Sequence, residues 1–104
     1  MIRNVLFNST NIKAGETLTM MVNATYPIVI EIYCFVTQPP PTKFVPCPSS
    51  GIHRLDYQEP FTFRTSPATF QSDGKLNVNV TDAESDTQSY EINVSGLNTP
   101  LSNY

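Results

Sequence analysis

Polar and apolar residues alternate strictly between Gly74 and Val94. The apolar residues keep one phase in each half of this segment: Leu76, Val78, Val80, Tyr90, Ile92 and Val94. A period of two with one apolar face is typical of a half-buried antiparallel strand. The polar run Asp82–Ser89 between the halves is typical of a turn, because Asp, Ser and Thr side chains bond to nearby backbone groups. The pattern therefore predicts a β-hairpin.

Shorter segments with the same character precede this hairpin. They predict strands over Ile2–Phe7, Thr17–Thr25, Ile28–Val36, Ile52–Tyr57 and Phe61–Thr65. The segment Ile28–Val36 is rich in β-branched residues, so we expect it to be a central strand. The polar segment Asn8–Gly15 is expected to be a loop. Pro39, Pro40 and Pro41 lack N–H donors, so an extended loop should follow the central strand and return through Cys47–Gly51.

Short strands with turn signals between them predict an all-β fold, an immunoglobulin-like β-sandwich of about seven antiparallel strands in two sheets. Residues 1–97 should form this single domain and residues 98–104 a C-terminal tail or linker. The length of 104 residues suffices for one hydrophobic core. Nine prolines against four glycines, without a long run of helix-forming residues, oppose a substantial helix.

Two segments resemble strands of known extracellular modules. Ala14–Ala24 is similar to their second strand, and Asp73–Ala83 is similar to their last hairpin. The chain thus resembles the PKD domains of polycystin-type receptors and the bacterial Ig-like repeats of surface proteins. The resemblance implies a sandwich fold and an extracellular role. Tyr33–Gln38 stands where a PKD domain carries Trp and a Gly-Asp-Gly turn, so no binding residues are carried over.

Four N-glycosylation sequons begin at Asn8, Asn23, Asn79 and Asn93. Three of them, Asn23, Asn79 and Asn93, fall on the polar phase of their strands, where a glycan leaves the core undisturbed. This placement predicts N-glycosylation. The alternative is that Asn and Thr are simply common on the solvent faces of β proteins.

Cys34 and Cys47 are the two cysteines of the chain. In an oxidising compartment they would form a disulfide that ties the proline-rich loop to the central strand, worth about 3 kcal/mol. The alternative is a pair of reduced thiols, with Cys34 buried in phase with Ile30 and Ile32. One histidine and no Cys-x-x-Cys spacing oppose a zinc site, so no cofactor is expected.

Candidate chemistry beyond these motifs is sparse. Asp82, Glu84 and Asp86 alternate along the acidic turn and offer oxygens to calcium, but a solvated turn is the simpler interpretation, and no metal site is assigned. His53 and its neighbours Asp56 and Glu59 lack a nucleophile motif. We therefore assign no catalytic residues and expect no enzyme activity.

Charge restricts the partners further. Six basic and nine acidic residues give a net charge of −3, and the basic residues are scattered. Nucleic acid and anionic membranes are therefore poor partners. No apolar run approaches the roughly 20 residues of a membrane span. The start Met1–Asn4 lacks the apolar region of a signal peptide, so the chain is either cytosolic or a domain of a longer secreted chain.

Together these patterns predict a non-catalytic extracellular module of a larger cell-surface or adhesion glycoprotein. It would act as a spacer and a protein-interaction surface toward a protein partner or neighbouring domains. The main alternative is a structural Ig-like domain of a virion, in a decoration or tail-associated role, or of a bacterial surface. A third, less favoured, is a carbohydrate-binding sandwich that uses Tyr26, Tyr33 and Tyr57.

Overall fold

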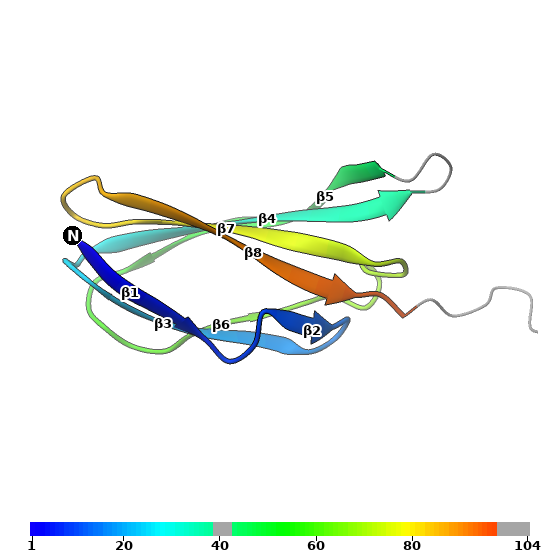
Figure 1. Cartoon of the computed structure of the whole chain (residues 1–104), viewed down its shortest axis with the longest axis horizontal. Coiled ribbons are helices and arrows are strands. Elements are labelled where there is room, and N and C mark those ends of the chain that lie inside the picture. The colour runs from blue at the N-terminus through cyan, green and yellow to red at the C-terminus, as the bar shows by residue number, and fades with distance from the viewer. Residues whose placement is uncertain (39–42, 98–104) are drawn as a thin grey trace, which may run out of the picture.

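The computed structural model describes residues 1–38 and 43–97. Two β-sheets face each other as layers in Figure 1. Their strands are β1 (Ile2–Phe7), β2 (Asn11–Lys13), β3 (Thr17–Ala24), β4 (Ile28–Gln38), β5 (Lys43–Leu55), β6 (Phe61–Arg64), β7 (Gly74–Thr81) and β8 (Thr87–Ser95). One sheet has the order β1-β3-β6 and the other β2-β8-β7-β4-β5. This confirms the predicted all-β sandwich in two sheets, here with eight strands.

The predicted hairpin consists of β7 and β8, which pair antiparallel from Gly74↔Val94 to Thr81↔Thr87. Strand β7 alternates strictly between buried and half-buried residues, as the sequence pattern predicts. Glycine is needed at position 74, where β7 begins, because a Cβ there would lie 2.2 Å from the backbone oxygen of Phe35. A side chain at position 74 would therefore collide with β4 at this end of the ladder.

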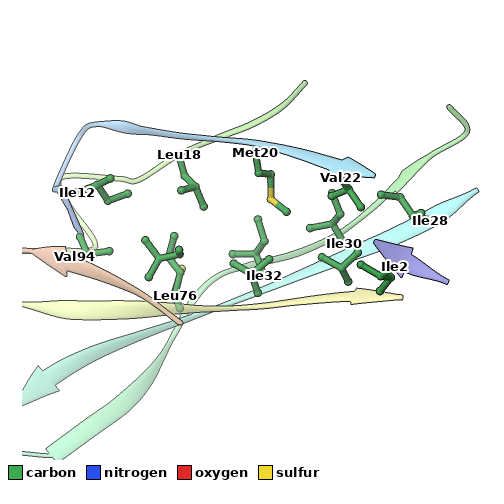
Figure 2. Close-up of a cluster of buried hydrophobic side chains, with 14 of the residues drawn as sticks. Ile2, Ile12, Leu18, Met20, Val22, Ile28, Ile30, Ile32, Leu76 and Val94 are labelled. Carbon is green, nitrogen blue, oxygen red and sulfur yellow. The ribbon is translucent and has the colours of Figure 1, made fainter. Parts of the chain in front are cut away.

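Strand β4 lies between β7 and β5 in the larger sheet, which confirms its predicted central position. Its residues Ile28, Ile30 and Ile32 are fully buried. Their side chains meet the inner face of β3, from which Leu18, Met20 and Val22 project across the sandwich (Figure 2). Each sheet thus presents one apolar face, and the two faces form a single core.

The polar segment Asn8–Gly15 contains a strand that the sequence did not predict. Strand β2 pairs parallel with β8, so the chain leaves the smaller sheet after β1 and joins the edge of the larger one. Three residues are too few for an alternation to be recognised. Ile12 is buried there, and it anchors the segment to the core.

The expected return loop over Cys47–Gly51 is also a strand. It belongs to β5, which pairs with β4 from Lys43 to Leu55 with one irregularity. Pro46 lies within this strand, and proline is tolerated there because β5 is the outer strand of its sheet.

The proline-rich tip at residues 39–42 and the predicted tail at residues 98–104 lie outside the described residues. In the described part of the chain, no helix is long and apolar enough to cross a membrane.

Candidate functional site

The outer face of the larger sheet carries an ordered set of polar and aromatic side chains. Because β4, β7 and β8 alternate in phase, residues that oppose each other in the ladders project outward together. The ladders align them in three rows: Phe35, Lys75 and Asn93; Tyr33, Asn77 and Glu91; Glu31, Asn79 and Ser89. The apolar residues between these rows point into the core.

A groove with a volume of about 360 Å³ lies over these rows. Its walls are formed by Tyr33, Phe35, Asn77, Asn79, Ser89, Tyr90 and Glu91. The groove thus combines aromatic rings with amides, a hydroxyl and a carboxylate on a rigid sheet. We take these residues as the candidate site and refer to them as the sheet groove.

Hydrogen bonds fix several side chains of the sheet groove. The Tyr33 hydroxyl donates to Glu31 Oε2 at 2.7 Å, and the Ser89 hydroxyl donates to Asn79 Oδ1 at 2.7 Å. The bond to Glu31 raises the pKa of the Tyr33 hydroxyl, because the carboxylate stabilises the protonated phenol. The Tyr33 hydroxyl and the Asn79 amide oxygen are therefore held in place by bonds within the protein.

Lys75 places a positive charge at the margin of the sheet groove. Its Nζ lies 3.2 Å from Glu91 Oε2. It also lies 4.5 Å from the ring centroid of Phe44 and 5.9 Å from that of Phe35. These cation–π and ionic contacts connect side chains from β8, β7, β4 and β5. The lysine charge is therefore already balanced within the protein.

The four sequon asparagines lie in different surroundings. Asn8 bonds to β3, since its Nδ2 donates to the Thr17 carbonyl and its Oδ1 accepts from the Thr19 amide. Asn93 is exposed, and its Nδ2 donates to Asn11 Oδ1 at 3.1 Å. Asn23 is half-buried and Asn79 lies in the sheet groove. Glycosylation at these positions stays a prediction.

The two cysteines are direct partners in the β4–β5 ladder. A hydrogen bond links their thiols, and no disulfide joins them in this structure. Burial raises the pKa of the Cys34 thiol to about 12, with a further contribution from Cys47. Opposed residues of antiparallel strands have Cα atoms about 4.5–5.5 Å apart, a spacing that a disulfide can bridge. The predicted disulfide stays a prediction for an oxidising compartment.

The acidic turn between β7 and β8 surrounds the chain's N-terminal ammonium group. Asp82 and Glu84 both contact the Met1 ammonium, and Asp86 accepts from the Ile2 amide at 3.0 Å. These contacts to the ammonium lower the pKa of the Asp82 and Glu84 carboxyls. Among the described residues, no group of three or more potential ligands that could hold a metal ion is found.

His53 and the two carboxyls considered with it face different surroundings. The His53 ring packs on Phe61 at a centroid distance of 4.9 Å, and its buried Nε2 has no hydrogen-bond partner in the described residues. Asp56 instead accepts from Arg54 at 3.0 Å, and Glu59 is exposed. His53 therefore links β5 to β6 through ring packing.

The three tyrosines predicted for carbohydrate binding are separated. Tyr26 packs against the core and its hydroxyl donates to the Val22 carbonyl at 2.6 Å. Tyr57 is exposed in the loop after β5. Of the three, Tyr33 lines the sheet groove. This groove could not be predicted from the sequence, because alternation shows which residues point outward, whereas only strand order and register show which of them are neighbours.

A second surface feature follows β5, which borders only β4 among the described strands. Three large apolar side chains are exposed at positions spread along β5 and just after it: Phe44 at 49%, opposite Thr37; Ile52 at 68%, opposite Glu31; and Tyr57 at 70%. We refer to these three residues as the β5 edge patch.

A scan against protein-family models and a search of curated proteins both return no match for this chain.

Proposed function

We propose that this protein is a non-catalytic extracellular module, similar to the PKD domains or bacterial Ig-like repeats that its sequence resembles, within a cell-surface or adhesion glycoprotein. The β-sandwich fold, the four sequons and the opposed cysteine pair support this proposal. In this role the sandwich is a rigid spacer that holds a contact surface at a fixed position.

The single observation that carries the contact role is the β5 edge patch. An edge strand offers unpaired backbone groups, and soluble proteins usually protect such an edge with charge, bulges or proline. Strand β5 carries Pro46, the exposed Arg54 and one ladder irregularity, yet it also exposes Phe44 and Ile52. Exposed apolar side chains beside an open ladder suit a protein partner that adds a strand or packs on the edge.

This contact role can be tested with Ile52→Arg. The fluorescently labelled domain is assembled into tetramers and added to an array of cells, each displaying one extracellular protein. We expect the wild-type tetramer to bind one of these proteins. The arginine should lower that binding at least tenfold, because it places a charge in an apolar contact. The matched control is Leu6→Arg, because Leu6 is 61% exposed but lies on β1 of the other sheet. Equal binding by both variants and the wild type would contradict a contact through β5.

The same experiment addresses the alternative role in a virion or on a bacterial surface. If the domain binds no displayed protein but associates with itself, and Ile52→Arg abolishes that association, a structural subunit role is favoured. Sedimentation of the unlabelled domain at several concentrations measures this self-association directly.

A further inference from the structure

We propose that Asn79 carries an N-linked glycan whose first sugar lies in the sheet groove. The inference rests on the proposed extracellular role, because N-glycosylation requires passage through the secretory pathway. It starts from one juxtaposition: the acceptor asparagine of the sequon Asn79-Val80-Thr81 is itself part of the groove wall.

The strand geometry allows a glycan on Asn79 to extend from the protein in one direction. Val78 and Val80 are fully buried on the inner face, so Asn79 projects from the outer face. In the ladders Asn79 is opposed by Glu31 on one side and by Ser89 on the other. Adjacent strands are about 4.8 Å apart and outward residues on one strand about 7 Å apart, which is the scale of one sugar ring. A sugar linked to Asn79 therefore starts between these walls.

The groove walls supply the groups that a sugar needs. The Tyr33 ring belongs to the adjacent row and offers an apolar face for the C–H face of a sugar. The Asn77 amide offers donors and an acceptor for sugar hydroxyls and for an acetamido group, and the Ser89 hydroxyl, whose hydrogen goes to Asn79 Oδ1, offers an acceptor. The groove thus matches both the apolar and the polar surface of an N-acetylhexosamine.

The charges of the groove favour a neutral occupant. Glu91 is paired with Lys75, and Glu31 accepts the Tyr33 hydroxyl. A charged ligand would have to displace one of these partners, whereas a neutral sugar leaves them in place. The glycan on Asn79 meets this requirement without the entropy loss of binding a separate molecule.

Asn93 provides the matched comparison. It is also on the outer face of the larger sheet and begins the sequon Asn93-Val94-Ser95. Asn93 is exposed and does not line the sheet groove, whereas Asn79 is half-buried and does. A glycan on Asn93 should therefore extend into solvent.

The test uses the full chain secreted from eukaryotic cells that make high-mannose glycans. Occupancy of each sequon is measured by peptide mass spectrometry and thermal stability by circular dichroism. Asn79→Gln should lower the melting temperature by about 4 °C, and Asn93→Gln should leave it unchanged. Trimming each glycan to its first sugar should preserve the difference, and Tyr33→Ala should remove it. The same substitutions in unglycosylated protein from bacterial cells measure the loss of each side chain's own hydrogen bond, from Asn79 to Ser89, from Asn93 to Asn11 and from Tyr33 to Glu31.

The outcomes separate this inference from the proposed function. Occupied Asn93 with unoccupied Asn79 overturns the groove glycan and leaves the extracellular role standing. Occupied Asn79 without a change in melting temperature, or with the change retained in Tyr33→Ala, also overturns it. If the secreted chain carries no glycan at any sequon, both the inference and the extracellular role lose their support.

Discussion

Thr65 shows how one buried polar side chain fixes a turn. It is fully buried after β6, and its hydroxyl accepts from the Gly15 amide at 2.9 Å and donates to the Glu16 carbonyl at 2.8 Å. Gly15 has a φ of +92°, a conformation that favours glycine. The hydroxyl therefore holds the turn between β2 and β3, and with it the start of β3, which contributes Leu18, Met20 and Val22 to the core.

Replacing Thr65 with valine tests this role. Valine has nearly the same shape but leaves the Gly15 amide and the Glu16 carbonyl without the hydroxyl, so Thr65→Val should lower the free energy of unfolding by about 1–3 kcal/mol. Urea denaturation measures the change. Thr62→Val is the control, because Thr62 is exposed on β6, and an equal loss in both variants would contradict the role of Thr65.

The sequence was enough to assign Asp82 to a turn. It could not show that Asp82 is buried or which group it contacts. Its side chain is fully buried, and Oδ1 accepts from the Glu84 and Asp86 amides at 2.9 Å each. The other oxygen contacts the Met1 ammonium, which is 81 residues away in sequence. A local pattern cannot show such a contact, because it exists only once β1 and the β7–β8 hairpin are side by side.

In a protein that starts at Met1 with a free ammonium group, this contact predicts how stability depends on pH. The ammonium lowers the Asp82 pKa below its ordinary 3.8, so the contribution is present above about pH 4 and is lost as pH falls through the lowered value. The carboxylates raise the Met1 pKa above 8.0, so the contribution is present below about pH 8 and is lost as pH rises through the raised value.

Unfolding free energies measured from pH 2 to pH 10 test this dependence. Asp82→Asn should be less stable than the wild type near neutral pH and should flatten both flanks of the profile. Glu59→Gln, at an exposed carboxyl, serves as the control. A profile for Asp82→Asn that runs parallel to that of the wild type would show that the Met1 contact contributes nothing.

At the scale of elements, the alternation predicts six of the strands, and the strand predicted over Ile52–Tyr57 also covers the end of β5 up to Leu55. Those six are β1, β3, β4, β6, β7 and β8, each long enough or apolar enough to show its phase. Strand β2 is held by pairing with β8, and β5 by pairing with β4, so tertiary contacts decide both. The sheet groove could not be predicted for the same reason, since its rows depend on register across three strands.

The β4–β5 pair predicts unequal reactivity of the two thiols. Cys34 is buried and its pKa is raised to about 12, whereas Cys47 is half-buried. Iodoacetamide at pH 8 should therefore modify Cys47 at least tenfold faster than Cys34 in the reduced native protein, because the thiolate is the reactive form. Peptide mass spectrometry after timed quenching measures both rates. If Cys34 were alkylated as fast in the native protein as in the urea-unfolded protein, this would contradict its buried environment.

At the scale of the molecule, the two sheets share one core, and the two surface features described above both belong to the larger sheet. The inner faces form one core, the outer face of the larger sheet carries the sheet groove, and its outer strand carries the β5 edge patch. Composition and alternation sufficed to predict the sandwich, because an apolar phase has to be buried against another sheet. The surfaces depend on which strands are neighbours, and that information appears only in the folded chain.

The extracellular role is tested most directly by the intact mass of the chain secreted from eukaryotic cells. The mass is compared before and after glycan removal, and before and after alkylation of the unfolded chain under non-reducing conditions. We expect N-linked glycans and two cysteines that resist alkylation until a reductant is added. An unglycosylated chain with both thiols open to alkylation would contradict the proposal of an extracellular module.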